Sequence, residues 1–203
     1  LAQEGLARDF FVKEPVDSES KKIPFRGFCW PGESYWPDFL RSDVRNWWGT
    51  QFSAPKFSDN VFVWNDMNEP SVFRMIDGTF PKNLIHKDDS KIEYEDREVH
   101  NLYGLLNSAA TMIGLSKYRL NERPFILSRS HFSGSQRYAW LWSGDNKAGW
   151  PDLETSLAHI LNFGISGFPF VGADVGGFAG DPNDRLLMRW FQAASWTYPF
   201  FRE

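Results

Sequence analysis

The sequence predicts an α/β fold, a (β/α)8 TIM barrel present here as a partial barrel, on three observations. Short apolar runs alternate with amphipathic helical patterns along most of the 203 residues. Several runs are apolar throughout, as strands buried on both faces of a parallel sheet are. Carboxylates, Arg and Trp follow these runs, where barrel enzymes place catalytic groups. An open nucleotide-binding sheet would instead show a Gly-rich phosphate turn after a strand, and we find none.

The apolar runs predict five strands, too few for a complete eight-stranded barrel. They cover residues 25–30, 60–65, 124–129, 138–142 and 165–171. We therefore expect residues 1–203 to form one partial catalytic barrel domain.

Helical spacing of apolar residues falls between these runs. It predicts helices over 42–48, 99–113 and 153–161, and another from Asp181-Pro182 onward. Asp96 is the expected cap of the second helix, and Pro151 starts the third. The charged stretch from about 74 to 98 predicts a solvated loop insertion.

Composition excludes some partners and leaves others open. The net charge is −4 and Lys and Arg do not cluster, which argues against nucleic acid or an anionic membrane surface as a partner. No apolar run reaches the length of a membrane span. Aromatic residues make up 17% of the chain, which fits either a well-packed core or a sugar site, since pyranose faces stack on aromatic rings.

Two strand ends carry the candidate catalytic carboxylates. The run VFVWNDMNEP places Asp66 where a buried strand opens into a loop, and YAWLWSGDN places Asp145 in the same way. Each alone is more typical of a helix cap or a turn. Together they match glycoside hydrolysis, which needs one ionised and one protonated carboxyl group on opposite sides of one bond. Trp140 and Trp142 predict an apolar wall beside Asp145.

A third strand end carries Arg129, in FILSRSHFSGSQRY. A buried Arg needs an anionic partner, and Asp174 in FVGADVGGF is the expected one. Such a pair holds the guanidinium rigid while its remaining donors meet sugar hydroxyls. Other chemistries lack their motifs: the four His residues show no HExxH spacing, so we expect no metal, and no G-x-S-x-G frame is present.

Four segments, in order, resemble glycoside hydrolase family 31: WNDMNEP, LSRSHFSGSQRY, WSGDN and GADVGGF. The resemblance implies that Asp66 is the nucleophile and Asp145 the general acid/base of a retaining exo-α-glucosidase without a cofactor. It implies sugar or pocket contacts from six further residues: Trp64, Met67, Arg129, Trp142, Asp174 and Phe178. Family members also have an Asp on an earlier strand and a His after the FFR motif, so we expect a partial catalytic domain.

The resemblance is strongest to members that trim glucose from N-linked glycans during glycoprotein quality control. It implies a glucosylated glycan or another α-glucoside as substrate, a noncatalytic β subunit as partner and the endoplasmic-reticulum lumen as location. Three alternatives stay open: a related α-glucosidase of starch or oligosaccharide breakdown, an α-xylosidase or transglycosylase on the same scaffold, and an inactive carbohydrate-binding fragment.

Overall fold

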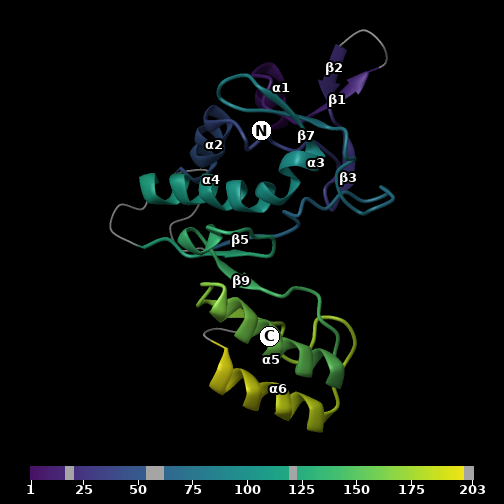
Figure 1. Ribbon diagram of the computed structural model, residues 1–203, viewed down its shortest axis with the longest axis vertical. Coiled ribbons are helices and arrows are strands. Elements are labelled where there is room, and N and C mark those ends of the chain that lie inside the picture. Colours follow the sequence, from purple (N-terminus) through teal and green to yellow (C-terminus); the bar gives the residue numbers. More distant parts are fainter. Residues whose placement is uncertain (17–20, 54–61, 119–122, 199–203) are drawn as a thin grey trace.

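A parallel sheet crosses the middle of the molecule (Figure 1). The computed structural model describes residues 1–16, 21–53, 62–118 and 123–198. The sheet has the order β10-β9-β8-β5, and every neighbouring pair is parallel. Its strands are β5 (Val63–Asn65), β8 (Ile126–Ser128), β9 (Trp140–Trp142) and β10 (Val171–Gly172). The parallel order confirms the α/β class.

Helices connect these strands, as parallel pairing requires. They are α4 (Tyr103–Tyr118) between β5 and β8, α5 (Trp150–Ile165) between β9 and β10, and α6 (Asp184–Thr197) after β10. In Figure 1, α4 lies on one side of the sheet, and α5 and α6 form the opposite end of the molecule. Helix α5 has its Pro in the first turn, where the missing N–H costs nothing.

The chain on either side of β5 builds a second layer around its own core. This layer contains α1 (Ala2–Ala7), α2 (Ser42–Gly49), the short 3-10 helix η1 (Thr50–Phe52) and an antiparallel sheet of order β2-β1-β6-β7. Its strands are β1 (Lys13–Val16), β2 (Lys21–Pro24), β6 (Ile85–Lys87) and β7 (Glu93–Glu95). Buried aromatic side chains fill the core beneath it: Phe10, Phe11, Phe25, Trp36, Phe39, Trp47, Phe80 and Tyr103.

Three short helices and a hairpin complete the described elements. Helix α3 (Asp96–Val99) and η2 (His100–Leu102) lead into α4, and η3 (Ser135–Arg137) precedes β9. The hairpin pairs β3 (Gly27–Cys29) with β4 (Gly32–Ser34) in antiparallel register. Helices α2 and α4 pack closely where Gly49 and Gly114 meet, because a Cβ on Gly114 would lie 2.6 Å from the Gly49 carbonyl oxygen.

Three predictions for individual elements were wrong. The run at 25–30 forms one strand of the β3–β4 hairpin and no part of the parallel sheet. In the run at 165–171, only Val171 belongs to a strand, β10, because α5 continues to Ile165 and a turn follows it. Helix α6 begins at Asp184 rather than Asp181, since the Asn183 side chain accepts the Leu186 N–H and caps it. The predicted start of the strand at 60–65 lies outside the described residues.

The charged stretch at 74–98 is not a solvated loop in its second half. It contains β6, β7 and the first helical turn of α3, which Glu95 caps in a reciprocal capping box with Glu98. His86 and Asp96 of this stretch are 3% and 1% exposed. Charge density misled the prediction because these charged groups pair with one another inside the protein.

Candidate functional site

The candidate residues follow successive strands of the parallel sheet. Asp66 comes directly after β5, and Arg129 directly after β8. Asp145 follows β9 by three residues, and Asp174 follows β10 by two. Because carboxyl ends of parallel strands share one edge of a sheet, all four residues lie at the edge where barrels carry their active sites.

Arg129 holds three carboxylates together. Its Nη2 lies 3.1 Å from Asp66 Oδ1, its Nε 2.8 Å from Glu69 Oε1, and its Nη1 2.8 Å from Asp145 Oδ2. One planar guanidinium therefore links Asp66 and Asp145, which brings their bound oxygens within roughly 8 Å of each other. The side chain of Arg129 is 15% exposed, whereas that of Asp145 is 59% exposed. We call these four residues the Arg129 cluster.

The cluster keeps its central cation charged. Burial alone lowers the pKa of Arg129, but the carboxylates of Glu69, Asp66 and Asp145 outweigh burial and raise that pKa above its ordinary value. The Trp142 ring adds a cation–π contact, with its centroid 5.8 Å from Arg129 Cζ. Arg129 is thus a fixed positive charge at the centre of the site.

The apolar wall expected around Asp145 is not what surrounds its carboxylate. The side chain is largely open to solvent and meets Arg129. Trp140 and Trp142 belong to β9, and the strand turns away at Gly144 before Asp145 is reached. The aromatic residues of β9 therefore do not surround the carboxylate of Asp145, although they shortly precede it in the sequence.

Two residues of the site occupy left-handed backbone conformations. Asp145 has φ of 50° and Met67 has φ of 58°. Non-glycine residues seldom adopt such angles, and those that do gather at functional sites. Glycine is required at position 144 for two reasons. Its φ of 66° is left-handed, and a Cβ there would lie 2.4 Å from Arg129 Cδ. The turn before Asp145 is therefore shaped to let the Arg129 stem pass.

The Arg129 cluster lies on the wall of a cavity of about 770 Å³. That size suits a small-molecule site. Six of the eight predicted site residues line it: Asp66, Asp145, Trp64, Met67, Arg129 and Phe178. Phe178 is held there by its N–H, which donates to the Asn146 carbonyl at 2.7 Å.

The other two predicted residues lie behind the cavity wall. Trp142 is 3% exposed and packs edge-on against Trp64 at 5.4 Å between ring centroids. Asp174 is 5% exposed. The predicted Arg129–Asp174 pair is not formed, because the carboxylates that contact Arg129 are those of Asp66, Glu69 and Asp145.

Asn146 joins the two loops that follow β9 and β10. Its Nδ2 donates to the Asp174 carbonyl at 2.9 Å, and its Oδ1 accepts the Asp174 N–H at 3.0 Å. Ser143 Oγ donates to the same Oδ1 at 3.0 Å. The Asn of the WSGDN segment therefore fixes the loop of Asp145 to the loop of Asp174 and Phe178.

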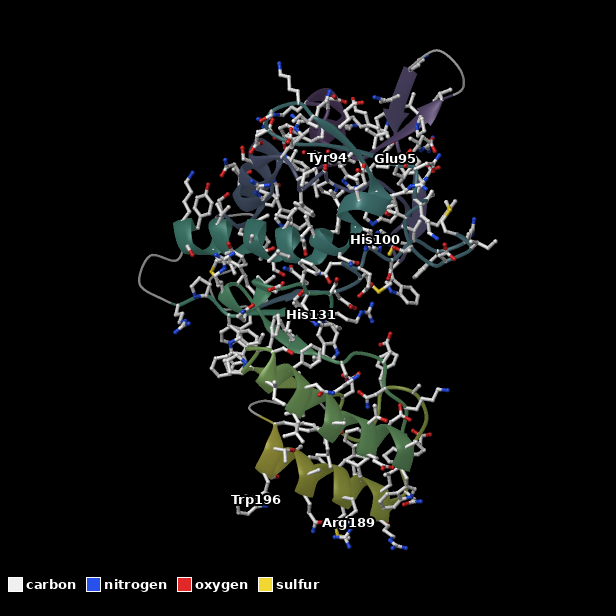
Figure 2. The ribbon with its side chains drawn as sticks, in the orientation of Figure 1. Tyr94, Glu95, His100, His131, Arg189 and Trp196 are labelled. Carbon is white, nitrogen blue, oxygen red and sulfur yellow. The ribbon has the colours of Figure 1, made fainter. Side chains whose placement is uncertain are left out.

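Several cavity residues were missed by sequence reasoning. Trp30, 77% exposed at the tip of the β3–β4 hairpin, packs edge-on against Phe73 at 4.9 Å between centroids. Both line the cavity, as does His131, which Figure 2 places beside the sheet. A sequence signal existed in CWPG, whose Pro-Gly predicts a tight turn that exposes the preceding Trp. Because Trp30 lies far from Asp66 in the sequence, this signal did not indicate that the two residues line the same cavity.

No group of three or more His, Cys, Asp or Glu side chains in the described part of the chain is arranged to hold a metal ion. Among the described helices, none has both the length and the apolar character to cross a membrane.

Known proteins resemble the chain over its whole length. The family model of the "Glycosyl hydrolases family 31 TIM-barrel domain" matches residues 1–203. Neutral alpha-glucosidase C of Mus musculus is 47% identical over 95% of this chain and 21% of its own length. Glucosidase 2 subunit alpha of Saccharomyces cerevisiae is 42% identical over 100% of this chain and 22% of its own.

A solved structure shows the same fold. The crystal structure of the "ER glucosidase II heterodimeric complex consisting of catalytic subunit and the binding domain of regulatory subunit" matches with a TM-score of 0.88 and 44% identity. The match covers 99% of this chain and 21% of that one. The chain thus spans about a fifth of the length of these relatives. It belongs to glycosyl hydrolase family 31 and forms part of that family's TIM-barrel domain.

Proposed function

We propose that this chain supplies the catalytic residues of a retaining α-glucosidase. One observation carries the proposal: two strand-end carboxylates, Asp66 and Asp145, meet one guanidinium at the wall of one cavity. Retaining glycosidases need two carboxyl groups about 5–5.5 Å apart. The shared guanidinium holds their bound oxygens within roughly 8 Å of each other, a limit that includes this spacing.

Asp66 is the nucleophile in this proposal. Its Oδ1 accepts the Met67 N–H at 2.8 Å and contacts Arg129 at 3.1 Å. Both donors fix the orientation of the carboxylate. We assign the attack on the anomeric carbon to Oδ2, which is not engaged by these two donors.

Asp145 is the general acid and then the general base. As Asp66 forms its bond to the anomeric carbon, the bond to the leaving oxygen breaks and Asp145 gives that oxygen a proton. A β-linked glucosyl ester of Asp66 results. Asp145 then takes a proton from water, water displaces Asp66 at the anomeric carbon, and α-glucose leaves. The contact of Asp145 with Arg129 uses Oδ2, so Oδ1 is assigned to the proton transfer.

The remaining cavity residues recognise the sugar. Trp64 and Phe178, 46% and 59% exposed, offer ring faces, and Met67 Sδ accepts from Arg129 Nη2 at 2.7 Å. Trp142 supports Trp64 and Arg129 from behind. We assign Asp174 a supporting place under the loop that carries Phe178, and Trp30 with Phe73 an aromatic contact for the leaving group.

We further propose that the substrate is a glucosylated N-linked glycan in the endoplasmic-reticulum lumen, and that a noncatalytic β subunit is the partner. The yeast relative named as an alpha subunit and the solved heterodimeric complex support this choice. The solved complex contains a regulatory subunit beside its catalytic one. A related α-glucosidase acting on free oligosaccharides is the second candidate, which the likeness to neutral alpha-glucosidase C favours.

Covalent labelling tests the proposal in the enzyme that contains this chain. A glucose-configured cyclitol aziridine should attach to Asp66, as located by peptide mass spectrometry, and the Asp66→Asn variant should remain unlabelled. NMR of early product should show α-glucose. Labelling of Glu69 instead, or release of β-glucose, would refute the assigned roles. Comparing glucosylated N-glycan with maltose by kcat/KM then separates the two substrate candidates.

A further inference from the structure

The loop that carries Asp66 and Glu69 is held from outside by the segment that the sequence presented as a charged insertion. The Val72 N–H donates to the Gly78 carbonyl at 2.9 Å. Thr79 Oγ1 donates to the Pro70 carbonyl at 2.5 Å. Pro70 is buried and follows Glu69, whose carboxylate contacts Arg129 Nε. The Thr79 hydroxyl thus binds the residue that directly follows Glu69 of the Arg129 cluster.

Thr79 is itself fixed on two sides. The next residue, Phe80, is 2% exposed and packs edge-on against Phe25, Trp36 and Tyr103. On the other side, His100 Nε2 lies 3.5 Å from Thr79 Oγ1. A Thr hydroxyl has one proton, and here Pro70 receives it. His100 Nε2 therefore lies at the outer limit of hydrogen-bond distance from the same oxygen, beside the Thr79–Pro70 hydrogen bond.

His100 is in turn anchored to a buried ionic group. Its Nδ1 lies 2.8 Å from Asp96 Oδ2, and Asp96 Oδ1 lies 3.0 Å from His86 Nε2. His86 Nδ1 lies 3.0 Å from Asp38 Oδ1. We call His86, Asp38 and Asp96 the His86 cluster. His100 occupies the space between the segment of Tyr94 and Glu95 and the sheet region of His131 (Figure 2).

This cluster is rigid because its groups are deeply buried and paired. Burial lowers the pKa of His86, but its hydrogen bonds to the carboxylates of Asp38 and Asp96 outweigh burial and raise that pKa to about 9. His86 is therefore an imidazolium at neutral pH and donates from both nitrogens. Removing one partner of such a buried group leaves an uncompensated charge, which opposes movement of the whole chain of contacts.

We propose that Thr79 is a positioning residue for the Asp66–Glu69 loop, with its hydroxyl set by His100 and the His86 cluster. The hydroxyl fixes the Pro70 carbonyl, Pro70 fixes the adjoining Glu69, and Glu69 fixes Arg129. The proposal rests on the function proposed above. Its consequence is that a group outside the cavity lining sets the geometry of the carboxylates inside it.

The test compares Thr79→Val with Thr79→Ser in the enzyme that contains this chain. Valine keeps the shape of threonine but cannot donate, whereas serine keeps the donor. Rates are expressed per mole of folded protein, measured by the amplitude of the thermal transition. We expect kcat of Thr79→Val to fall about 10- to 100-fold with little change in KM, because small misplacements of catalytic groups cost this much. Thr79→Ser should stay within about threefold of wild type.

Two results overturn the inference. One is equal kcat per folded molecule for the valine and serine variants. The other is a valine variant whose only defect is a smaller folded fraction, since that outcome makes the hydroxyl purely structural. The wild-type labelling experiment distinguishes these failures from failure of the proposed function: if wild type is labelled at Asp66 and only the Thr79 pair behaves alike, the positioning role alone is wrong.

Discussion

The Arg129 cluster and the His86 cluster use the same device, one cation shared by carboxylates, in different surroundings. The cation of the Arg129 cluster lies on a cavity wall, and its carboxylates range from 28% to 59% exposed. The cation and carboxylates of the His86 cluster are 5% exposed or less. Exposed carboxylates remain able to meet a ligand and exchange protons, whereas buried ones only hold structure. Burial, rather than residue type, separates the cluster that we propose to be catalytic from the one that we assign a structural role.

The largest loss of activity is expected from Asp66→Asn, which alters the Arg129 cluster and leaves the His86 cluster intact. The amide keeps the size of the side chain and its neighbours but cannot form the glucosyl ester. We expect kcat to fall by roughly 10⁴-fold or more, as for other enzymes that lose a nucleophile. Steady-state rates with an aryl α-glucoside measure this effect, and Asp43→Asn, on the exposed start of α2, is a matched control. Activity near that of the control would remove Asp66 from the mechanism.

His86→Leu should disrupt the His86 cluster, none of whose residues lines the cavity. It leaves Asp38 and Asp96 buried without their shared cation, and loss of one partner of a buried ion pair costs about 3–5 kcal/mol. We expect a clearly lower Tm in thermal unfolding of the enzyme. His159→Leu, on the exposed face of α5, is the matched control and should change the free energy of unfolding by less than about 0.5 kcal/mol. Equal Tm values for the two variants would contradict the assigned structural role.

The His86 cluster also predicts a dependence of stability on pH. Because the pKa of His86 is raised in the folded protein to about 9, above its unfolded value near 6.5, its contribution is complete below pH 6.5. That contribution is lost as pH rises through 9, by about 3 kcal/mol in all. Tm measured from pH 6 to 10 should fall over this window, and the fall should be much smaller in His86→Leu. An identical fall in both proteins would place its origin elsewhere.

The sequence predicted the Arg129 cluster better than the His86 cluster for a physical reason. Strand-end residues of a parallel sheet share one edge, so recognising the strands before Asp66, Arg129 and Asp145 was enough to place them together. Asp38 and His86 meet through an antiparallel layer whose pairing no local pattern specifies. In a run as charged as HKDDSKIEYEDRE, a buried histidine cannot be told from a solvated one.

The same reasoning explains the one wrong partner within the site. The prediction paired Asp174 with Arg129 because both residues follow strands. However, β9 lies between β8 and β10 in the sheet, and the direction of each side chain depends on the loop that follows its strand. Arg129 turns toward Glu69, on the loop after β5, and the Gly144 turn leaves room for it to do so. The hydrophobic periodicity of the sequence predicts the strands but not the conformation of the loops that follow them.

The smallest effect, and the sharpest geometric test of the Arg129 cluster, is expected from Gly144→Ala. The added Cβ would lie 2.4 Å from Arg129 Cδ, on a backbone with φ of 66° that alanine adopts reluctantly. Arg129 must shift, and its contacts to Asp66 and Asp145 shift with it, so we expect kcat/KM to fall about 10- to 100-fold. Gly167→Ala, at a φ of 83° with the nearest atom, Gln136 Nε2, 3.8 Å from the new Cβ, carries the backbone cost alone. If the two variants lose activity equally, the close passage of Arg129 past Gly144 has no part in setting the catalytic geometry.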